Sequence, residues 1–130
     1  MIVGTGMDLV TIQRFRGFRE RRGERGLVRV FTESELQYCM SRVDPAPSLA
    51  ARFAAKEAFF KAIGLGWGVG GGWLDVEVTR DDRGAPGLDL SGRAAETAME
   101  RGVIRSHLSL THTDEVAGAV VVLESGGRGA

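Results

Sequence analysis

The central helix of the fold is predicted by one stretch, Ser48-Leu49-Ala50-Ala51-Arg52-Phe53-Ala54-Ala55-Lys56-Glu57-Ala58-Phe59-Phe60-Lys61-Ala62-Ile63-Gly64. At about 100° per residue, its large apolar residues fall on one stripe and its alanines on a neighbouring face. Because both faces can pack, we expect this helix to be central and largely buried. Ser48 is its predicted N-cap, and Gly64 is its predicted left-handed stop.

The segments around this helix alternate between strand and helix patterns. The capping box formed by Thr32 and Glu35 is the strongest start signal among them. The predicted elements are a strand over 2–10, a glycine-interrupted helix from 11, a short helix ending near 41, a rigid loop over 44–47, a glycine-rich loop over 64–72, strands over 73–79 and up to 90, a helix over 91–101, and a hairpin of strands over 106–111 and 116–123. This mixture predicts a single α+β domain over 1–124, with an antiparallel sheet packed on the long central helix and a disordered tail over 125–130.

Composition excludes several classes of protein. The formal net charge is zero, so bulk charge implies neither a nucleic-acid nor a membrane partner. No apolar run approaches the roughly 20 residues that a membrane span needs. The single cysteine, Cys39, excludes an internal disulfide framework and suits a reducing compartment, so we expect a cytoplasmic protein. Residues 11–30 nevertheless hold seven arginines against two glutamates.

Three charged residues could form a phosphate-handling metal site. Glu57 and Lys61 lie one turn apart on the predicted helix, and Asp8 shares a strand face with Gly4 and Gly6. The glycines leave room for a close approach to the backbone. Magnesium prefers one or two carboxylates together with water and substrate phosphate oxygens. An exposed Glu–Lys pair, with Asp8 capping the next helix, explains the same residues without any ligand.

Other residues with possible chemistry give weaker signals. Lys56 falls almost inside the bulky stripe, where it either has a specific role or extends its amine to solvent. His107 and His112, with one cysteine, are too few for a zinc site. His112 fits a satisfied edge histidine better than a ligand, although with Thr113 beside it a phosphate contact is the alternative.

Two spaced motifs carry a resemblance to a known family. The first is Gly6-Met7-Asp8 within Gly4-Thr5-Gly6-Met7-Asp8, and the second is the F-x-x-K-E-x-x-x-K pattern from Phe53 to Lys61. Together they resemble the holo-(acyl-carrier-protein) synthases, the small single-domain 4'-phosphopantetheinyl transferases. Supporting stretches include 31–36, 73–78 and 108–113, so that the resemblance covers nearly the whole chain.

The resemblance implies a fold, a reaction and a set of site residues. The expected reaction is the Mg²⁺-dependent transfer of 4'-phosphopantetheine from coenzyme A to a serine of an apo acyl carrier protein, with release of adenosine 3',5'-bisphosphate, in fatty-acid or polyketide synthesis. The implied roles are metal ligands at Asp8 and Glu57, catalysis by Glu57 and Lys61, coenzyme A contacts at Arg52, Lys56, Lys61, Gly64, Gly66, His112 and Thr113, and carrier docking at Arg14 and Arg21.

The family also implies a homotrimer with a site at each subunit interface. Two rivals stay open from the sequence. One is a non-catalytic module that binds a carrier protein, and the other is a related transferase that serves a polyketide or peptide carrier.

Overall fold

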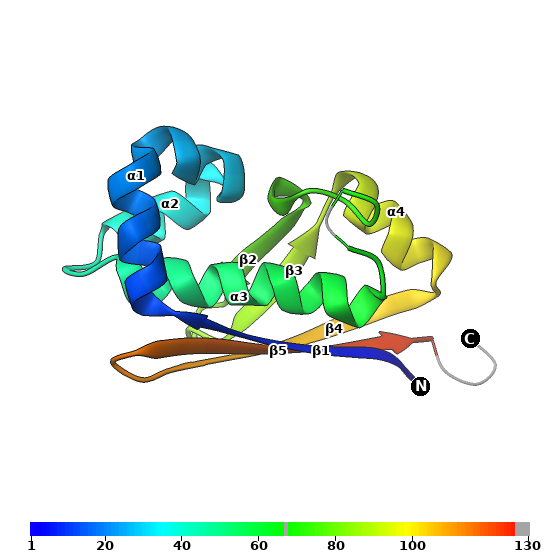
Figure 1. Ribbon diagram of the computed structural model, residues 1–130. Helices are drawn as coiled ribbons and strands as arrows, with labels where there is room; N and C mark the ends of the chain where they lie inside the picture. Colours follow the sequence, from blue (N-terminus) through cyan, green and yellow to red (C-terminus); the bar gives the residue numbers. More distant parts are fainter. Residues whose placement is uncertain (67, 127–130) are drawn as a thin grey trace.

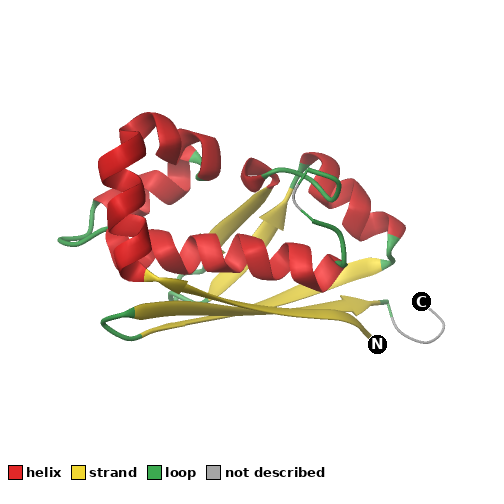
Figure 2. Cartoon of the chain, viewed as in Figure 1, coloured by secondary structure: helices red, strands yellow, loops and turns green. Residues whose placement is uncertain are grey.

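The computed structural model describes residues 1–66 and 68–126 and has two antiparallel sheets (Figures 1 and 2). The larger sheet has the strand order β1-β5-β4, and the smaller one pairs β2 with β3. The elements in chain order are β1 (Ile2–Thr11), α1 (Ile12–Val30), α2 (Glu33–Met40), α3 (Ala46–Ile63), the short 3-10 helix η1 (Trp73–Asp75), β2 (Val76–Arg80), β3 (Pro86–Leu90), α4 (Gly92–Glu100), β4 (Val103–His112) and β5 (Val116–Ser125). The α+β prediction is confirmed.

Helix α3 lies across one face of the three-stranded sheet, and the opposite face carries no helix among the described residues (Figure 1). Most of α3 is buried, including the alanines Ala50, Ala54, Ala55 and Ala58. Alternate residues of β5 (Ala117, Ala119, Val121 and Leu123) complete the core beneath it. The small residues let the helix backbone lie close to the sheet, so the predicted central helix is confirmed.

Several boundaries differ from the sequence predictions. Helix α3 begins at Ala46, so Ser48 lies within its first turn and does not cap it. Pro47 is tolerated there because the first turn of a helix does not use its N–H groups internally. Residues 73–75 form a 3-10 turn instead of strand, which leaves Leu74 exposed. Ser125 belongs to β5, where its N–H donates to the carbonyl of Met1, and residues 127–130 of the predicted tail lie outside the described residues.

Other local signals are confirmed. The capping box at the start of α2 is formed by Thr32 and Glu35, and Gly64 ends α3 with a φ of 77°. Helix α1 is interrupted at Gly23, whose φ of 61° is accessible mainly to glycine. In the part of the chain that the structure describes, no helix is both long enough and apolar enough to cross a membrane.

Candidate active site

Two glycines on β1 determine how closely α3 approaches the sheet. A Cβ atom on Gly4 would lie 2.1 Å from the carbonyl oxygen of Ala62, and one on Gly6 would lie 2.0 Å from that of Ala58. Both distances are far shorter than any real contact of a Cβ atom. The group that approaches the strand backbone is therefore α3 itself, and the contact brings the next residue on this face, Asp8, beside the helix.

Asp8, Glu57 and Lys61, which we call the carboxylate cluster, come together where β1 meets α3. Asp8 is paired across the sheet with the buried Ala119, so its side chain lies on the α3 side of the sheet. The Lys61 Nζ donates to the Asp8 Oδ1 at 2.9 Å and to the Met7 carbonyl oxygen at 3.1 Å. The Lys61 side chain is 54% exposed, so this group can still meet a ligand.

The two carboxylates of the cluster interact electrostatically. Burial raises the pKa of Glu57, and the negative charge of Asp8 raises it further. Lys61 and Arg14 act in the opposite direction through their positive charges. A carboxylate whose pKa is raised by a neighbouring carboxylate also favours a cation beside it.

The donor set of the cluster fits Mg²⁺. Among the described residues no group of three or more His, Cys, Asp or Glu side chains could hold a metal ion. The cluster offers two carboxylates, those of Asp8 and Glu57. Magnesium binds in this way, through one or two carboxylates, and takes its other ligands from water and substrate phosphates. Asp8 and Glu57 would be its protein ligands.

A second site, the basic pocket, is a cavity of about 430 Å³ at the other edge of the molecule. Its walls come from the end of α2, the first half of α3, the turn between β2 and β3, and the last residues of β4. Four of the described lining residues can carry positive charge and none is acidic; the four are Arg42, Arg52, Arg80 and His112. Three phosphate-binding guanidinium groups in one cavity favour a ligand with phosphate groups.

The guanidinium groups of the basic pocket are stacked around one aromatic ring. The Cζ atoms of Arg52, Arg80 and Arg42 lie 4.4, 4.9 and 5.5 Å from the centre of the Tyr38 ring. Arg52 is only 3% exposed, and its Nη1 donates to the Ser48 carbonyl oxygen at 3.4 Å. Its Nε is buried with no hydrogen-bond partner in the described structure. A buried N–H without a partner is costly, so an acceptor beside this group would be favourable.

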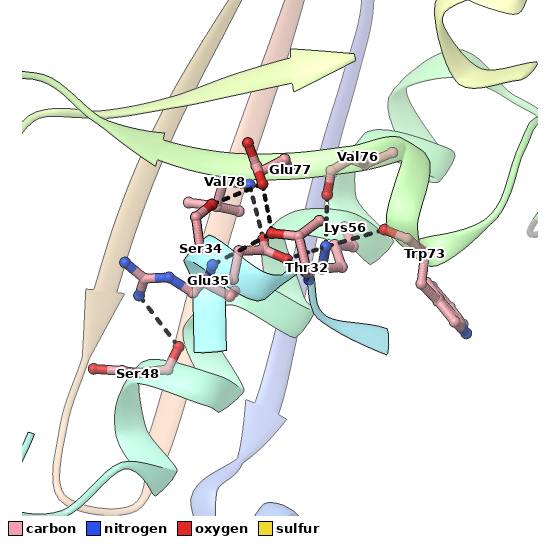
Figure 3. Close-up of polar contacts among 10 residues, drawn as sticks. Thr32, Ser34, Glu35, Ser48, Lys56, Trp73, Val76, Glu77 and Val78 are labelled. Carbon is pink, nitrogen blue, oxygen red and sulfur yellow. Dashed lines mark hydrogen bonds and ion pairs between the residues drawn. The ribbon is translucent and has the colours of Figure 1, made fainter. Parts of the chain in front are cut away.

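Lys56, which the resemblance places at coenzyme A, belongs neither to the described lining of the basic pocket nor to the carboxylate cluster. Its side chain is fully buried, and its Nζ donates to the Glu35 Oε1 at 2.8 Å and to the carbonyl oxygens of Trp73 and Val76 at 3.0 and 2.6 Å (Figure 3). An ammonium group has three donors, and all three are used inside the protein. Burial lowers the pKa of Lys56, while the neighbouring Glu35 opposes this effect.

The other predicted site residues belong neither to the described lining of the basic pocket nor to the carboxylate cluster. Arg14 and Arg21 are exposed on α1, and Arg14 lies over the ring of Phe53, with 5.8 Å between its Cζ and the ring centre. Gly64 and Gly66 are exposed in the loop that follows Lys61. The Thr113 Oγ1 accepts from the N–H groups of Glu115 and Val116, so Thr113 shapes the turn between β4 and β5.

The sequence prediction missed three residues of the basic pocket, namely Tyr38, Arg42 and Arg80. Each of the three lies on a different segment. The chain has many arginines, so no local pattern distinguishes Arg42 and Arg80 from the others. The sequence did contain one signal for the neighbouring Lys56–Glu35 pair, because Lys56 falls among the large apolar residues of the predicted helix. A buried lysine needs a carboxylate partner, and Glu35 on the neighbouring helix supplies it.

Comparison with known proteins supports one family over nearly the whole chain. The family model described as the 4'-phosphopantetheinyl transferase superfamily matches residues 4–121. A holo-(acyl-carrier-protein) synthase of Anaeromyxobacter sp. strain K is 51% identical over 130 residues, which cover 98% of this chain and 99% of that protein.

Solved structures give the same result. The holo-(acyl-carrier-protein) synthase of Neisseria meningitidis matches with a TM-score of 0.89 and 31% identity, over 96% of this chain and all of the other. The corresponding protein of Bacillus anthracis, solved in complex with coenzyme A (3',5'-ADP), matches with a TM-score of 0.80 and 38% identity, over 97% of this chain and 99% of the other.

Proposed function

Because this chain belongs to the holo-(acyl-carrier-protein) synthase family of 4'-phosphopantetheinyl transferases, we propose that it transfers 4'-phosphopantetheine from coenzyme A to an apo acyl carrier protein. The acceptor is a serine hydroxyl, and adenosine 3',5'-bisphosphate leaves. The observation that carries this proposal is the meeting of Asp8, Glu57 and Lys61 where α3 crosses β1. The physiological carrier belongs to fatty-acid or polyketide synthesis, and the proposed location is the cytoplasm.

The carboxylate cluster has the charges that this transfer needs. Asp8 and Glu57 would hold Mg²⁺, which when bound would neutralise pyrophosphate charge and help to lower the pKa of the serine hydroxyl. Lys61 is exposed beside them and can offset the negative charge that develops on the departing 3',5'-bisphosphate. The bond from phosphorus to the serine oxygen forms as the bond to the leaving phosphate breaks.

The basic pocket is the proposed site for the phosphate-bearing nucleotide end of coenzyme A. Its arginines supply positive charge, His112 can carry one, and the Arg52 Nε has no hydrogen-bond partner among the described residues. Gly64 and Gly66 are proposed to lie along the pantetheine arm, beside Lys61. Thr113 contributes by holding the turn that follows His112.

We propose that α1 docks the carrier protein through Arg14 and Arg21. The two residues are seven apart and precede the interruption at Gly23, so that they lie on the same helix face. The charge of Arg14 reaches Glu57, which places this face beside the carboxylate cluster. An acidic carrier bound there would present its serine close to the proposed metal ligands.

We propose further that the chain works as a homotrimer whose site is shared between subunits. Arg52 and Glu57 are five residues apart, so they point in directions about 140° apart around α3. The cluster lies at the β1 edge of the sheet and the pocket reaches the β4 edge. In the proposed trimer, one coenzyme A molecule uses the pocket of one subunit and the cluster of its neighbour.

A transfer assay tests the proposed function. The chain would be incubated with coenzyme A, Mg²⁺ and several apo carrier proteins, and the carriers would be weighed by mass spectrometry. Asp8→Asn and Glu57→Gln should each abolish transfer and keep the wild-type circular dichroism spectrum. Full transfer by either variant with magnesium chelated would contradict the proposed metal site.

A further inference from the structure

A buried ion pair joins three elements that are far apart in the sequence. Glu35 on α2 and Lys56 on α3 are 1% and 0% exposed, and the Lys56 Nζ also binds the carbonyl of Val76 at the start of β2 (Figure 3). The second carboxylate oxygen of Glu35 accepts from the N–H of Val78 at 2.8 Å. The pair therefore fixes α2, α3 and β2 relative to one another.

Neither member of the pair can reach a substrate. All three donors of Lys56 are used, and Glu35 also accepts from the N–H of Thr32 at 2.8 Å. Buried ion pairs can often be replaced by apolar residues without loss of stability, because desolvation offsets their attraction. A contribution to stability alone therefore does not explain why a buried ion pair occupies this position. Its effect on the geometry of the three elements is the better explanation.

Each element that the pair fixes carries one member of the stack in the basic pocket. Tyr38 follows Glu35 by three residues on α2, and Arg52 precedes Lys56 by four residues on α3, which are spacings of one helical turn. Arg80 follows Val78 by two residues on β2, the spacing that returns to the same strand face. A shift of any of the three elements would separate the Arg52–Tyr38–Arg80 stack.

We propose that Glu35 and Lys56 are positioning residues that set the geometry of the Arg52–Tyr38–Arg80 stack and through it the affinity for the nucleotide end of coenzyme A. This inference rests on the proposed function, because it takes the basic pocket as the nucleotide site. It gives the first lysine of the F-x-x-K-E-x-x-x-K pattern a role different from that of Lys61, which faces the reacting groups.

Binding and kinetics test the positioning role directly. Glu35→Gln and Lys56→Met should raise the KM for coenzyme A, and the Kd for adenosine 3',5'-bisphosphate measured by calorimetry, by about tenfold, the size expected of an orienting partner. The KM for the carrier protein and kcat should stay within about twofold. Unchanged affinity for the bisphosphate in both folded variants would overturn the proposal.

A core variant separates positioning from loss of stability. Leu123→Ala removes a fully buried side chain on β5, which contributes no described residue to the basic pocket. It should lower the unfolding midpoint to a similar extent and leave the KM for coenzyme A unchanged. An equal rise in KM in Leu123→Ala would show that general destabilisation is the cause.

A double-mutant cycle keeps the test decisive if Lys56→Met fails to fold. Tyr38→Leu removes the ring at the centre of the stack, and it should raise the Kd for the bisphosphate on its own. Combined with Glu35→Gln, it should add little, because both changes act on the same stack. Full additivity of the two effects on the Kd would refute the proposal that Glu35 acts through the stack. A wild-type chain that neither binds the bisphosphate nor transfers 4'-phosphopantetheine would refute the proposed function itself.

Discussion

At the level of single residues, the two lysines of the chain carry the same ammonium group but have different roles, because their surroundings differ. Lys56 is enclosed and uses its donors on Glu35 and two backbone carbonyls. Lys61 is exposed and holds Asp8 at the edge of the proposed metal site. Arginine could not replace Lys56, because its planar guanidinium does not fit three converging acceptors.

Lys61→Met should separate catalysis from stability. Exposed ion pairs contribute about 0.2–1 kcal/mol, so the free energy of unfolding should change by less than about 1 kcal/mol. Loss of a group that stabilises developing charge should lower kcat by roughly 10²–10³. Steady-state transfer assays and urea unfolding measure the two effects, and a Lys61→Met enzyme with wild-type kcat would exclude this role.

Because the Cys39 thiol is buried, we expect the protein to lose stability at high pH. Burial raises the pKa of its thiol from 9.0 to about 11. Between these values the unfolded thiol ionises while the folded one stays protonated, so stability is complete below pH 9 and falls as the pH rises toward 11. The loss is about 2–3 kcal/mol at most, from 1.36 kcal/mol per pKa unit.

Unfolding of Cys39→Ala beside the wild type isolates that contribution, since the other titrating groups are common to both proteins. The stability difference between the two should change across pH 9–11 in favour of the variant. A difference that is constant with pH would show that the thiol ionises equally in both states.

At the scale of elements, the contact between α3 and β1 depends on the missing side chain of Gly6. Gly6→Ala places a methyl group against the Ala58 carbonyl and should cost about 1–3 kcal/mol or more, as other overpacked cores do. It should also move Asp8 from Lys61 and lower kcat. Gly72→Ala is the matched control, because its added methyl group meets no atom within 4 Å. Equal stabilities of the two variants, measured in urea, would argue against this contact.

The two halves of α1 should differ in carrier binding. Reversing the charges of Arg14 and Arg21 to glutamate should raise the KM for the carrier protein about tenfold or more at low salt, and less at high salt. The KM for coenzyme A should barely change. The charge-matched control is the double variant Arg25→Glu, Arg29→Glu, because both residues lie beyond the interruption at Gly23. If both pairs act alike in steady-state kinetics, overall charge and not a docking face is responsible.

Local signals predicted most of the elements but only part of the site. The Thr32–Glu35 capping box and the Gly64 stop act within one turn, so they are readable from sequence. The start of α3 was placed too late because Pro47 looked like a loop residue. Glu35 was recognised as a cap but not as the partner of Lys56, since that contact spans 21 positions and depends on tertiary packing. Arg52 and His112 of the basic pocket were predicted through the resemblance, whereas Tyr38, Arg42 and Arg80 were missed for the same reason.

At the scale of the whole molecule, the face of the sheet away from α3 favours assembly. Val3, Met7, Leu9 and Val120 are exposed on it at 43%, 60%, 64% and 40%. Met7 pairs with Val120 and Leu9 with Gly118, and these positions alternate along the strands with the buried ones, so Met7, Leu9 and Val120 share the outer face. An apolar face of this kind marks an interaction surface, and a second copy of the chain is the proposed occupant.

Mixed oligomers test the shared site. Glu57→Gln disables the cluster and leaves the pocket, whereas Arg80→Ala with His112→Ala disables the pocket and leaves the cluster. Each protein alone should be inactive, and co-refolded mixtures should regain about a quarter of wild-type activity by random pairing around a closed ring. Sedimentation would establish the number of subunits. A mixture that stays inactive, or an active monomer, would rule out sharing between subunits.

The order of the strands also determines when the protein can fold during synthesis. β5 follows the other described strands along the chain and lies in the middle of the sheet, where its Glu124 pairs with Ile2 of β1. Neither β1 nor β4 can join the sheet until β5 has left the ribosome, and such distant pairings fold slowly. Until then the alanine-rich side of α3 has no sheet to cover it. Closure of the sheet over α3 is therefore a late event for the nascent chain.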